Sequence, residues 1–237
     1  MVISLTSPQN ITSINLGTST PKLSGTVDVT SFINLVAFEA YAGSTGNDLE
    51  GFVISEANDK LKYVSVLYNK LTGSIIQYMP INVENISIQS NLLDTPITDL
   101  SIFTQLQVIA TSNNPNMGGN IPTLPSSINV VDFGRSGLTG DIPPLNAYTN
   151  LIRLWVYLNP NLTIPSNWTA PVTLKNILFQ SCNLETTEVD TILAVINSLG
   201  TSNGVLNLGG INATPTGGNS NSDKLALEAR GWSVTIS

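Results

Sequence analysis

Catalytic side chains are scarce in this sequence. Histidine is absent from all 237 residues, which removes the commonest general base and the commonest metal ligand. The one thiol, Cys182, therefore has no histidine to activate it as a nucleophile, and a serine–histidine–aspartate triad cannot form. No glycine-rich loop ends in Gly-Lys-Ser or Gly-Lys-Thr, as a phosphate-binding loop would. The residue types thus give no support to nucleophilic catalysis or phosphoryl transfer.

Paired carboxylates are the remaining catalytic possibility, because two of them suffice for glycoside hydrolysis. Glu39 and Asp132 are the candidates, since they stand at corresponding places in two similar segments. Acidic residues also gather at positions 48–50 and 185–190, but neither group has the spacing of a calcium loop. We interpret these groups as solvated surface or as acids at a helix start, and we expect no metal and no cofactor.

The charge balance argues against a nucleic-acid partner. Lysine and arginine total only 9 and are scattered, and the formal net charge is −7. Proteins that bind phosphate backbones instead cluster their basic residues on one face. Charged residues make up only 11% of the chain, so asparagine, serine, threonine and glycine fill most polar positions. We expect a neutral, hydrogen-bonding surface that does not bind nucleic acid.

The elements that position these side chains follow from an internal repeat. Leu61, Val64, Val66, Asn69 and Leu71 fit the pattern LxxLxLxxNxL, which recurs along the chain at spacings of 22–26 residues. A ninth strand-like segment, VLNLGG, follows at 205–210, and several units close on sequences such as LSGTV or LTGDIP. The units begin at residues 11, 35, 61, 83, 106, 128, 151 and 174.

Each unit predicts one coil of a stacked structure. The LxL alternation has period two, so it predicts a short strand with its leucines inward, and successive strands should form a parallel sheet. A single coil cannot bury its apolar face, so the array is stable only as a stack. The ninth place of the unit should hold a ladder of inward side chains that bond the backbone of adjacent coils. These are Asn69, Asn91, Asn114 and Asn159, with Ser136 and Cys182 in the same slot, where the cysteine is interpreted as buried rather than reactive.

On these motifs the sequence resembles the leucine-rich-repeat superfamily, over about residues 11–210. The resemblance implies an α/β repeat solenoid, a horseshoe with a parallel concave sheet and a mostly irregular or 3₁₀ convex side. Short C-terminal helices are expected over 186–200, capped by Thr187, and from Ser222 to Gly231, followed by a strand at 232–236. Residues 211–237 resemble the C-terminal cap of leucine-rich-repeat proteins from phages and bacteria of the Bacteroidota type. We expect residues 1–237 to form a single domain.

The repeat separates the two candidate carboxylates. Counting the first leucine of a unit as place one, places three, five and seven point out of the concave face. Glu39 and Asp132 both occupy place five, four coils apart. At about 4.8 Å per strand they lie close to 20 Å apart, too far for a two-carboxylate mechanism. We therefore expect a binding protein rather than an enzyme.

Two groups of outward residues carry the types enriched at binding hot spots. Aromatic rings beside amides and a carboxylate would suit a sugar, but the same residues could contact a neighbouring subunit or simply reflect strand preference. The first group is Arg153, Trp155 and Tyr157, with Asp132 and Arg135 one coil away; the second is Tyr41, Tyr63 and Tyr68.

The resemblance of the cap implies a protein of the virion surface, such as a fibre, spike or capsid decoration. Its partners would be other virion subunits or a host surface glycan or protein, and a homo-oligomer is compatible with the low charge. The alternative is a secreted or cell-surface bacterial adhesin. The first residues, MVISLTSPQNITSINLG, lack a basic region followed by a long apolar run, so we expect no Sec signal. No stretch is apolar enough to predict membrane insertion.

Overall fold

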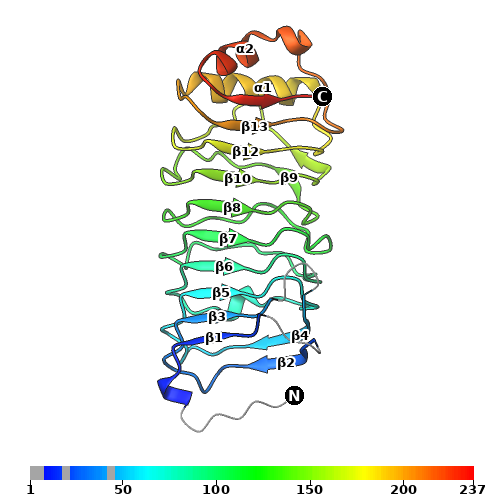
Figure 1. Ribbon diagram of the computed structural model, residues 1–237. Coiled ribbons are helices and arrows are strands. Elements are labelled where there is room, and N and C mark those ends of the chain that lie inside the picture. Colours follow the sequence, from blue (N-terminus) through cyan, green and yellow to red (C-terminus); the bar gives the residue numbers. More distant parts are fainter. Residues whose placement is uncertain (1–7, 18–21, 42–45) are drawn as a thin grey trace.

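The protein is a parallel β-solenoid in which successive coils stack one above the other (Figure 1). The computed structural model describes residues 8–17, 22–41 and 46–237. Residues 1–7, on which part of the expectation about an export signal falls, lie outside the described residues. The predicted repeat solenoid is therefore confirmed at the level of a stacked parallel array. None of the described helices is both long and apolar enough to cross a membrane.

One strand from each coil joins a ten-stranded parallel sheet. The middle residue of each strand points inward, as Phe38, Val64 and Leu154 do with no exposed surface. The strands pair in register, so the same place of each unit forms a row across the sheet. In sheet order they are β1 (Ser13–Asn15), β3 (Ala37–Glu39), β5 (Tyr63–Ser65), β6 (Asn85–Ser87), β7 (Val108–Ala110), β8 (Val130–Asp132), β10 (Arg153–Trp155), β12 (Asn176–Leu178), β13 (Val205–Asn207) and β14 (Ser233–Thr235).

The return segments are more regular than the repeat predicted. Two short two-stranded sheets form there, β2 (Ser24–Asp28) with β4 (Asp48–Val53) and β9 (Thr139–Asp141) with β11 (Asn161–Thr163). Both pairs are parallel because they join equivalent segments of coils that lie against each other. Single 3₁₀ turns occur at η1 (Pro8–Asn10), η2 (Ile76–Tyr78) and η3 (Gly218–Ser220).

Two helices close the C-terminal end, α1 (Thr186–Ser198) and α2 (Ser222–Ala229), which lie together above β13 in Figure 1. The prediction that Thr187 caps the first helix is wrong, because Glu185 occupies the N-cap. The Glu185 backbone N–H donates to the carboxylate of Glu188 at 2.8 Å. The same carboxylate accepts the Ile164 N–H at 2.7 Å, so Glu188 joins the helix start to the preceding coil.

The ladder asparagines are buried and bridge adjacent coils. Asn159 shows the full pattern: its Oδ1 accepts the backbone N–H groups of Ser136 and Leu138, and its Nδ2 donates to Phe133 and Val156. Asn69, Asn91 and Asn114 make the equivalent bonds to their own preceding coils.

Two further ladder residues, Asn47 and Asn212, were not predicted. Asn212 accepts the N–H groups of Cys182 and Leu184 and donates to Phe179 and Leu208. Extra residues precede both asparagines in their units, so they do not fall on the ninth place counted from the leucines. The position of the ladder residue in a unit is determined by the backbone N–H and C=O groups that need hydrogen-bond partners, not by a fixed count of residues.

Cys182 lies in this ladder with no exposed surface, and its Sγ is 3.2 Å from the Val156 carbonyl oxygen. Burial raises the pKa of its thiol to about 11. Because only the thiolate reacts, we expect iodoacetamide at pH 8 to modify the folded chain at least roughly 100-fold more slowly than the urea-unfolded chain. Mass spectrometry of timed samples measures both rates. Equal rates would contradict a buried ladder role for Cys182.

Candidate functional site: the outer face of the ten-stranded sheet

The outer face of the main sheet, which we call the sheet face, carries a patch of aromatic, basic and acidic side chains at its centre. We define the central patch as Ser112, Asp132, Arg153, Trp155 and Tyr157. Arg153 and Trp155 lie on β10, and Asp132 ends β8. The Cα atoms of Trp155 and Asp132 are register partners in the parallel pair. Because the coils are stacked in register, three successive coils contribute to one surface.

Trp155 is held on two sides by its neighbours. The Arg153 guanidinium lies 4.4 Å from the centroid of the indole ring, within the range of a cation–π interaction. On the next coil, Asn176 accepts the indole Nε1–H at 2.7 Å. These contacts fix the ring without burying it, since both Arg153 and Trp155 remain partly exposed. The pair therefore presents a preorganised aromatic and cationic surface.

Asp132 is almost completely buried, although it stands on an outward place. Its side chain accepts hydrogen bonds from the Ser112 hydroxyl at 2.9 Å and the Gly134 N–H at 3.2 Å. Burial raises the pKa of this carboxyl, and the two hydrogen bonds and the charge of Arg153 only partly oppose the rise. A desolvated carboxylate costs free energy unless it is fully paired. Such a group on a sheet face marks a candidate functional position.

This burial predicts the pH response of Asp132→Asn. Because the folded-state pKa of Asp132 is raised, the native chain holds the proton more tightly than the unfolded chain does. Protonated Asp132 therefore favours folding below its unfolded pKa of about 3.9, and this contribution to stability is lost as the pH rises through the folded-state pKa. Asparagine avoids the charge and still accepts the Gly134 N–H. We expect the variant to have a higher free energy of unfolding than wild type at pH 7. Urea titrations should show this advantage shrink between pH 7 and pH 3.5; an advantage that grows towards acid would contradict it.

The ring of Tyr157 lies across Gly134 of the preceding coil. A Cβ atom at position 134 would stand 2.2 Å from both Cε1 and Cζ of that ring, so the tyrosine occupies the space of the missing side chain. Its phenol lies close to Asp132 and to Ser112, the latter two coils from its own strand. Burial raises the pKa of the Tyr157 phenol, and the charge of Asp132 raises it further. Tyr157 thereby connects three coils.

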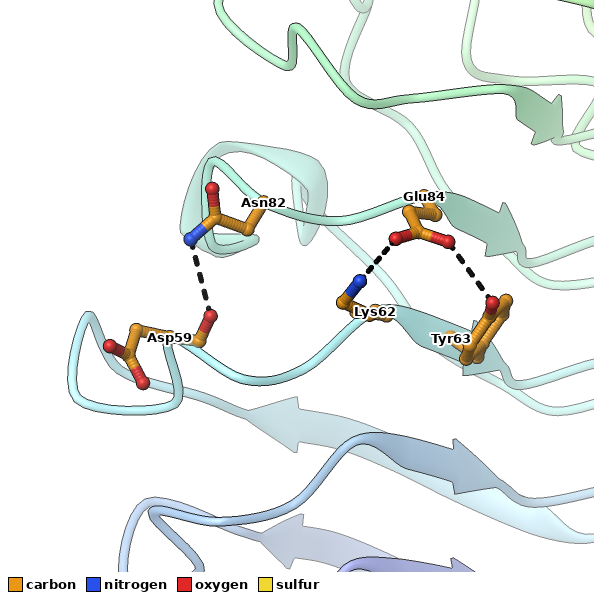
Figure 2. Close-up of polar contacts among 5 residues, drawn as sticks. All are labelled: Asp59, Lys62, Tyr63, Asn82 and Glu84. Atoms are coloured by element: carbon orange, nitrogen blue, oxygen red, sulfur yellow. Dashed lines mark hydrogen bonds and ion pairs between the residues drawn. The ribbon is translucent and has the colours of Figure 1, made fainter.

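The second aromatic group is less uniform. Figure 2 shows the Tyr63 hydroxyl donating to Glu84 at 3.0 Å, beside the ion pair of Lys62 with the same carboxylate. Glu84 raises the pKa values of Tyr63 and Lys62, and their hydrogen bonds lower its own. The Tyr63 ring stays exposed, as does that of Tyr41. Lys62, Tyr63 and Glu84 therefore form a polar cluster at the start of β5 and β6.

Two predicted residues, Tyr68 and Arg135, lie beyond their strands. Both occupy a turn position with positive φ, 53° and 49°, directly before the ladder residue. The Arg135 backbone N–H donates to the carbonyl of Tyr157 at 2.7 Å, while its side chain is exposed. Tyr68 is exposed too, and it lies close enough to Tyr157 to affect the pKa of that phenol. The structure thus places Tyr68 of the second group near Tyr157 of the first.

The two candidate catalytic carboxylates are kept apart. Strands β5, β6 and β7 separate Glu39 on β3 from Asp132 on β8. The carboxylate of Glu39 instead accepts the side-chain amide of Asn15 at 2.8 Å. Within the described ranges no group of three or more acidic or cysteine side chains is placed to hold a metal ion. Glu39 and Asp132 are therefore not placed to act as a pair in two-carboxylate chemistry.

Ser112 and Gly134 are the site residues that sequence reasoning did not select. Both fall on place seven, but a serine and a glycine carry no sign of binding by themselves. The pair of Gly134 and Tyr157 could have indicated the site. A glycine at place seven, followed by a tyrosine at the same place one coil later, leaves room for the tyrosine ring to pack flat on the sheet face.

The arrangement defines the class of protein: a parallel β-solenoid with an aromatic and arginine patch on its main sheet. No family of known proteins matches this chain, and no curated protein matches it.

Proposed function

We propose that this chain is a non-catalytic leucine-rich-repeat protein that recognises a partner through its sheet face. The observation that carries the proposal is the central patch, where Trp155 and Arg153 are stacked, fixed and still accessible to solvent. Aromatic and arginine side chains that lose little conformational freedom on contact are the usual anchors of recognition surfaces.

The resemblance of the C-terminal cap supports a place on the surface of a virion, with host surface molecules or other virion subunits as partners. The low content of charged residues fits a surface that recognises by shape and hydrogen bonding rather than by charge. A secreted adhesin would use the same sheet face. The identity of the partner that the chain binds therefore distinguishes a virion-surface protein from a secreted adhesin.

The test is binding of the labelled chain to a glycan array and to the structural proteins encoded beside its gene. We expect Trp155→Ala to weaken the wild-type interaction roughly tenfold or more, the cost of losing an anchor residue. Tyr78→Ala is the matched control, because Tyr78 is an exposed aromatic on η2, outside the main sheet.

Equal losses in Trp155→Ala and Tyr78→Ala, or no wild-type binding to either panel, would overturn the proposal. Polysaccharide hydrolysis that a single carboxylate substitution abolishes would overturn its non-catalytic part.

A further inference from the structure

The sheet face is buried at one place where its pattern requires exposure. Outward residues of most coils are partly or fully exposed, as Ser65 and Ser87 are. Ala110, Ser112 and Asp132 have only 4%, 4% and 7% of their surface exposed. Beside these residues, on the neighbouring coil, Tyr157 lies back across Gly134 with its phenol close to Asp132 and Ser112. An aromatic ring has thus been laid onto the sheet rather than projecting from it.

A ring in this position has one side on the sheet and the other towards solvent. The side towards the sheet fills the space above Gly134, and Tyr157 as a whole remains partly exposed. Beneath it, Asp132 holds both the Gly134 N–H and the Ser112 hydroxyl, so the backbone that supports the ring is itself fixed. An immobilised aromatic face that lies along the surface is a stacking platform, and its order is established before any ligand binds.

The side chains beside the platform are neutral hydrogen-bonding groups. In the same row of the sheet face lie Gln89, which is partly exposed, and Gln180, which is exposed. The buried Oε1 of Gln89 has no hydrogen-bond partner among the described residues, so a turn of the side chain towards solvent would let it accept a donor from a ligand. Tyr68, near the phenol of Tyr157, adds a second exposed ring towards the N-terminal coils. The polar groups and the two rings together cover a length of several coils.

The two charged groups around the platform, Asp132 and Arg153, have opposite signs and lie close enough to interact. Together they carry no net charge that would select an anionic or a cationic ligand. Arg153 is engaged with the face of Trp155 and is not paired with a carboxylate in any of the described ion pairs. A flat ligand rich in hydroxyl groups and without charge meets all of these conditions: it stacks on a ring and hydrogen-bonds to amides.

We propose that the Tyr157 ring, seated on Gly134, is the stacking platform for a neutral oligosaccharide, and that Gly134 is the residue that sets its position. The inference rests on the proposed recognition function and names its ligand class. Asp132 and Ser112 act as positioning residues, because they fix the backbone under the ring and do not themselves face the ligand. Tyr68 and Gln89 extend the site towards the next sugar units.

The decisive variant is Gly134→Ala. It changes the surface on which the Tyr157 ring packs and removes no aromatic residue. The φ of Gly134 is not in the left-handed region, so alanine is compatible with the backbone, but its Cβ must displace the Tyr157 ring. On an array of neutral, uronic-acid, sialylated and amino-sugar glycans, we expect wild-type binding on neutral glycans only. Gly134→Ala and Tyr157→Ala should each weaken it roughly tenfold or more. The double variant should lose no more than either single variant.

Gly209→Ala is the matched control. Gly209 is the corresponding glycine of the β13 coil, and a Cβ there would lie 3.2 Å from Thr235 Cγ2, 3.4 Å from Asn207 Oδ1 and 3.6 Å from the Ile236 carbonyl oxygen, with no atom as close as the Tyr157 ring is to position 134. We expect that variant to bind like wild type. Thermal unfolding of each variant separates loss of binding from loss of folding, and if Gly134→Ala does not fold, Tyr157→Ala and Tyr157→Phe provide the test, with phenylalanine retaining most of the affinity.

Preference for charged glycans, or unchanged binding by folded Gly134→Ala, would overturn the inference. Wild-type binding to a virion protein that Trp155→Ala abolishes, with no glycan bound, would also overturn it but would leave the proposed recognition function intact. If the wild-type chain bound neither a glycan nor a virion protein, both the inference about the oligosaccharide and the proposed recognition function would be overturned.

Discussion

Replacing Asn159 with alanine is expected to lower the free energy of unfolding by about 3 kcal/mol or more, and to separate the solenoid into two less cooperative halves. The side chain makes four buried hydrogen bonds with backbone groups, three to the β8 coil and one to Val156 of its own coil, and so joins the β8 and β10 coils. Each buried group left without a partner costs about 1–3 kcal/mol, and alanine can replace none of these bonds. Because stability in a stacked array depends on the interfaces between neighbours, a defect in the middle weakens coupling along the whole stack. Urea unfolding and hydrogen exchange measure both effects.

The control is Asn167→Ala in the same coil, where the asparagine is exposed. It should change the free energy of unfolding by less than about 0.5 kcal/mol, the usual range for surface substitutions. A second comparison is Ser136→Ala, which removes the contacts of its hydroxyl with the carbonyl oxygens of Thr111 and Gly134 and leaves its N–H on Asn159. If Asn159→Ala were no more costly than Ser136→Ala, the ladder would not be the main bridge between these coils.

The sequence was sufficient for the stack because its signals are local and periodic. Leucines at fixed spacing predict an inward row, and the observed register pairs equivalent residues, such as Leu154 with Val131 and Ile177. Prediction failed where the count of residues changed, as it did before Asn47 and Asn212, and where a helix start offered several capping residues. In α1 the choice fell on Glu185 because Glu188, three residues on, could bond its N–H as well as the preceding coil.

The candidate site was less predictable because its defining contacts run between coils. Arg153, Trp155 and Tyr157 could be placed on one strand segment from spacing alone. The direction in which a side chain leans could not, since Tyr157 lies back over Gly134 only because that residue has no side chain. The burial of Asp132 was not foreseen either, because an outward place in a strand pattern predicts exposure, whereas its carboxylate turns to bond the Ser112 hydroxyl and the Gly134 N–H.

Replacing Trp232 with alanine is expected to release the C-terminal cap, with a loss of about 3–5 kcal/mol in the free energy of unfolding, as for other buried aromatic residues. The indole is 3% exposed, and its Nε1–H donates to the carbonyl of Thr201 at 2.9 Å. The ring fills the space beside Gly204, where a Cβ would stand 2.3 Å from it. Arg230 reinforces the same contact through Thr201 and Asn197. Hydrogen exchange should therefore show early loss of protection in α2 and β14.

The matched comparison is Trp155→Ala, because the two tryptophans separate stability from recognition. Trp155 is partly exposed and its ring lies on the surface, so its removal should leave the unfolding midpoint nearly unchanged while it weakens partner binding. Trp232→Ala should do the reverse, since the central patch lies on β8 and β10 and the cap begins beyond β12. An uncapped end exposes apolar surface of α1, so we also expect this variant to self-associate in light scattering. Unchanged protection of α2 and β14 in Trp232→Ala would mean that the cap is held by α1 and Arg230 alone.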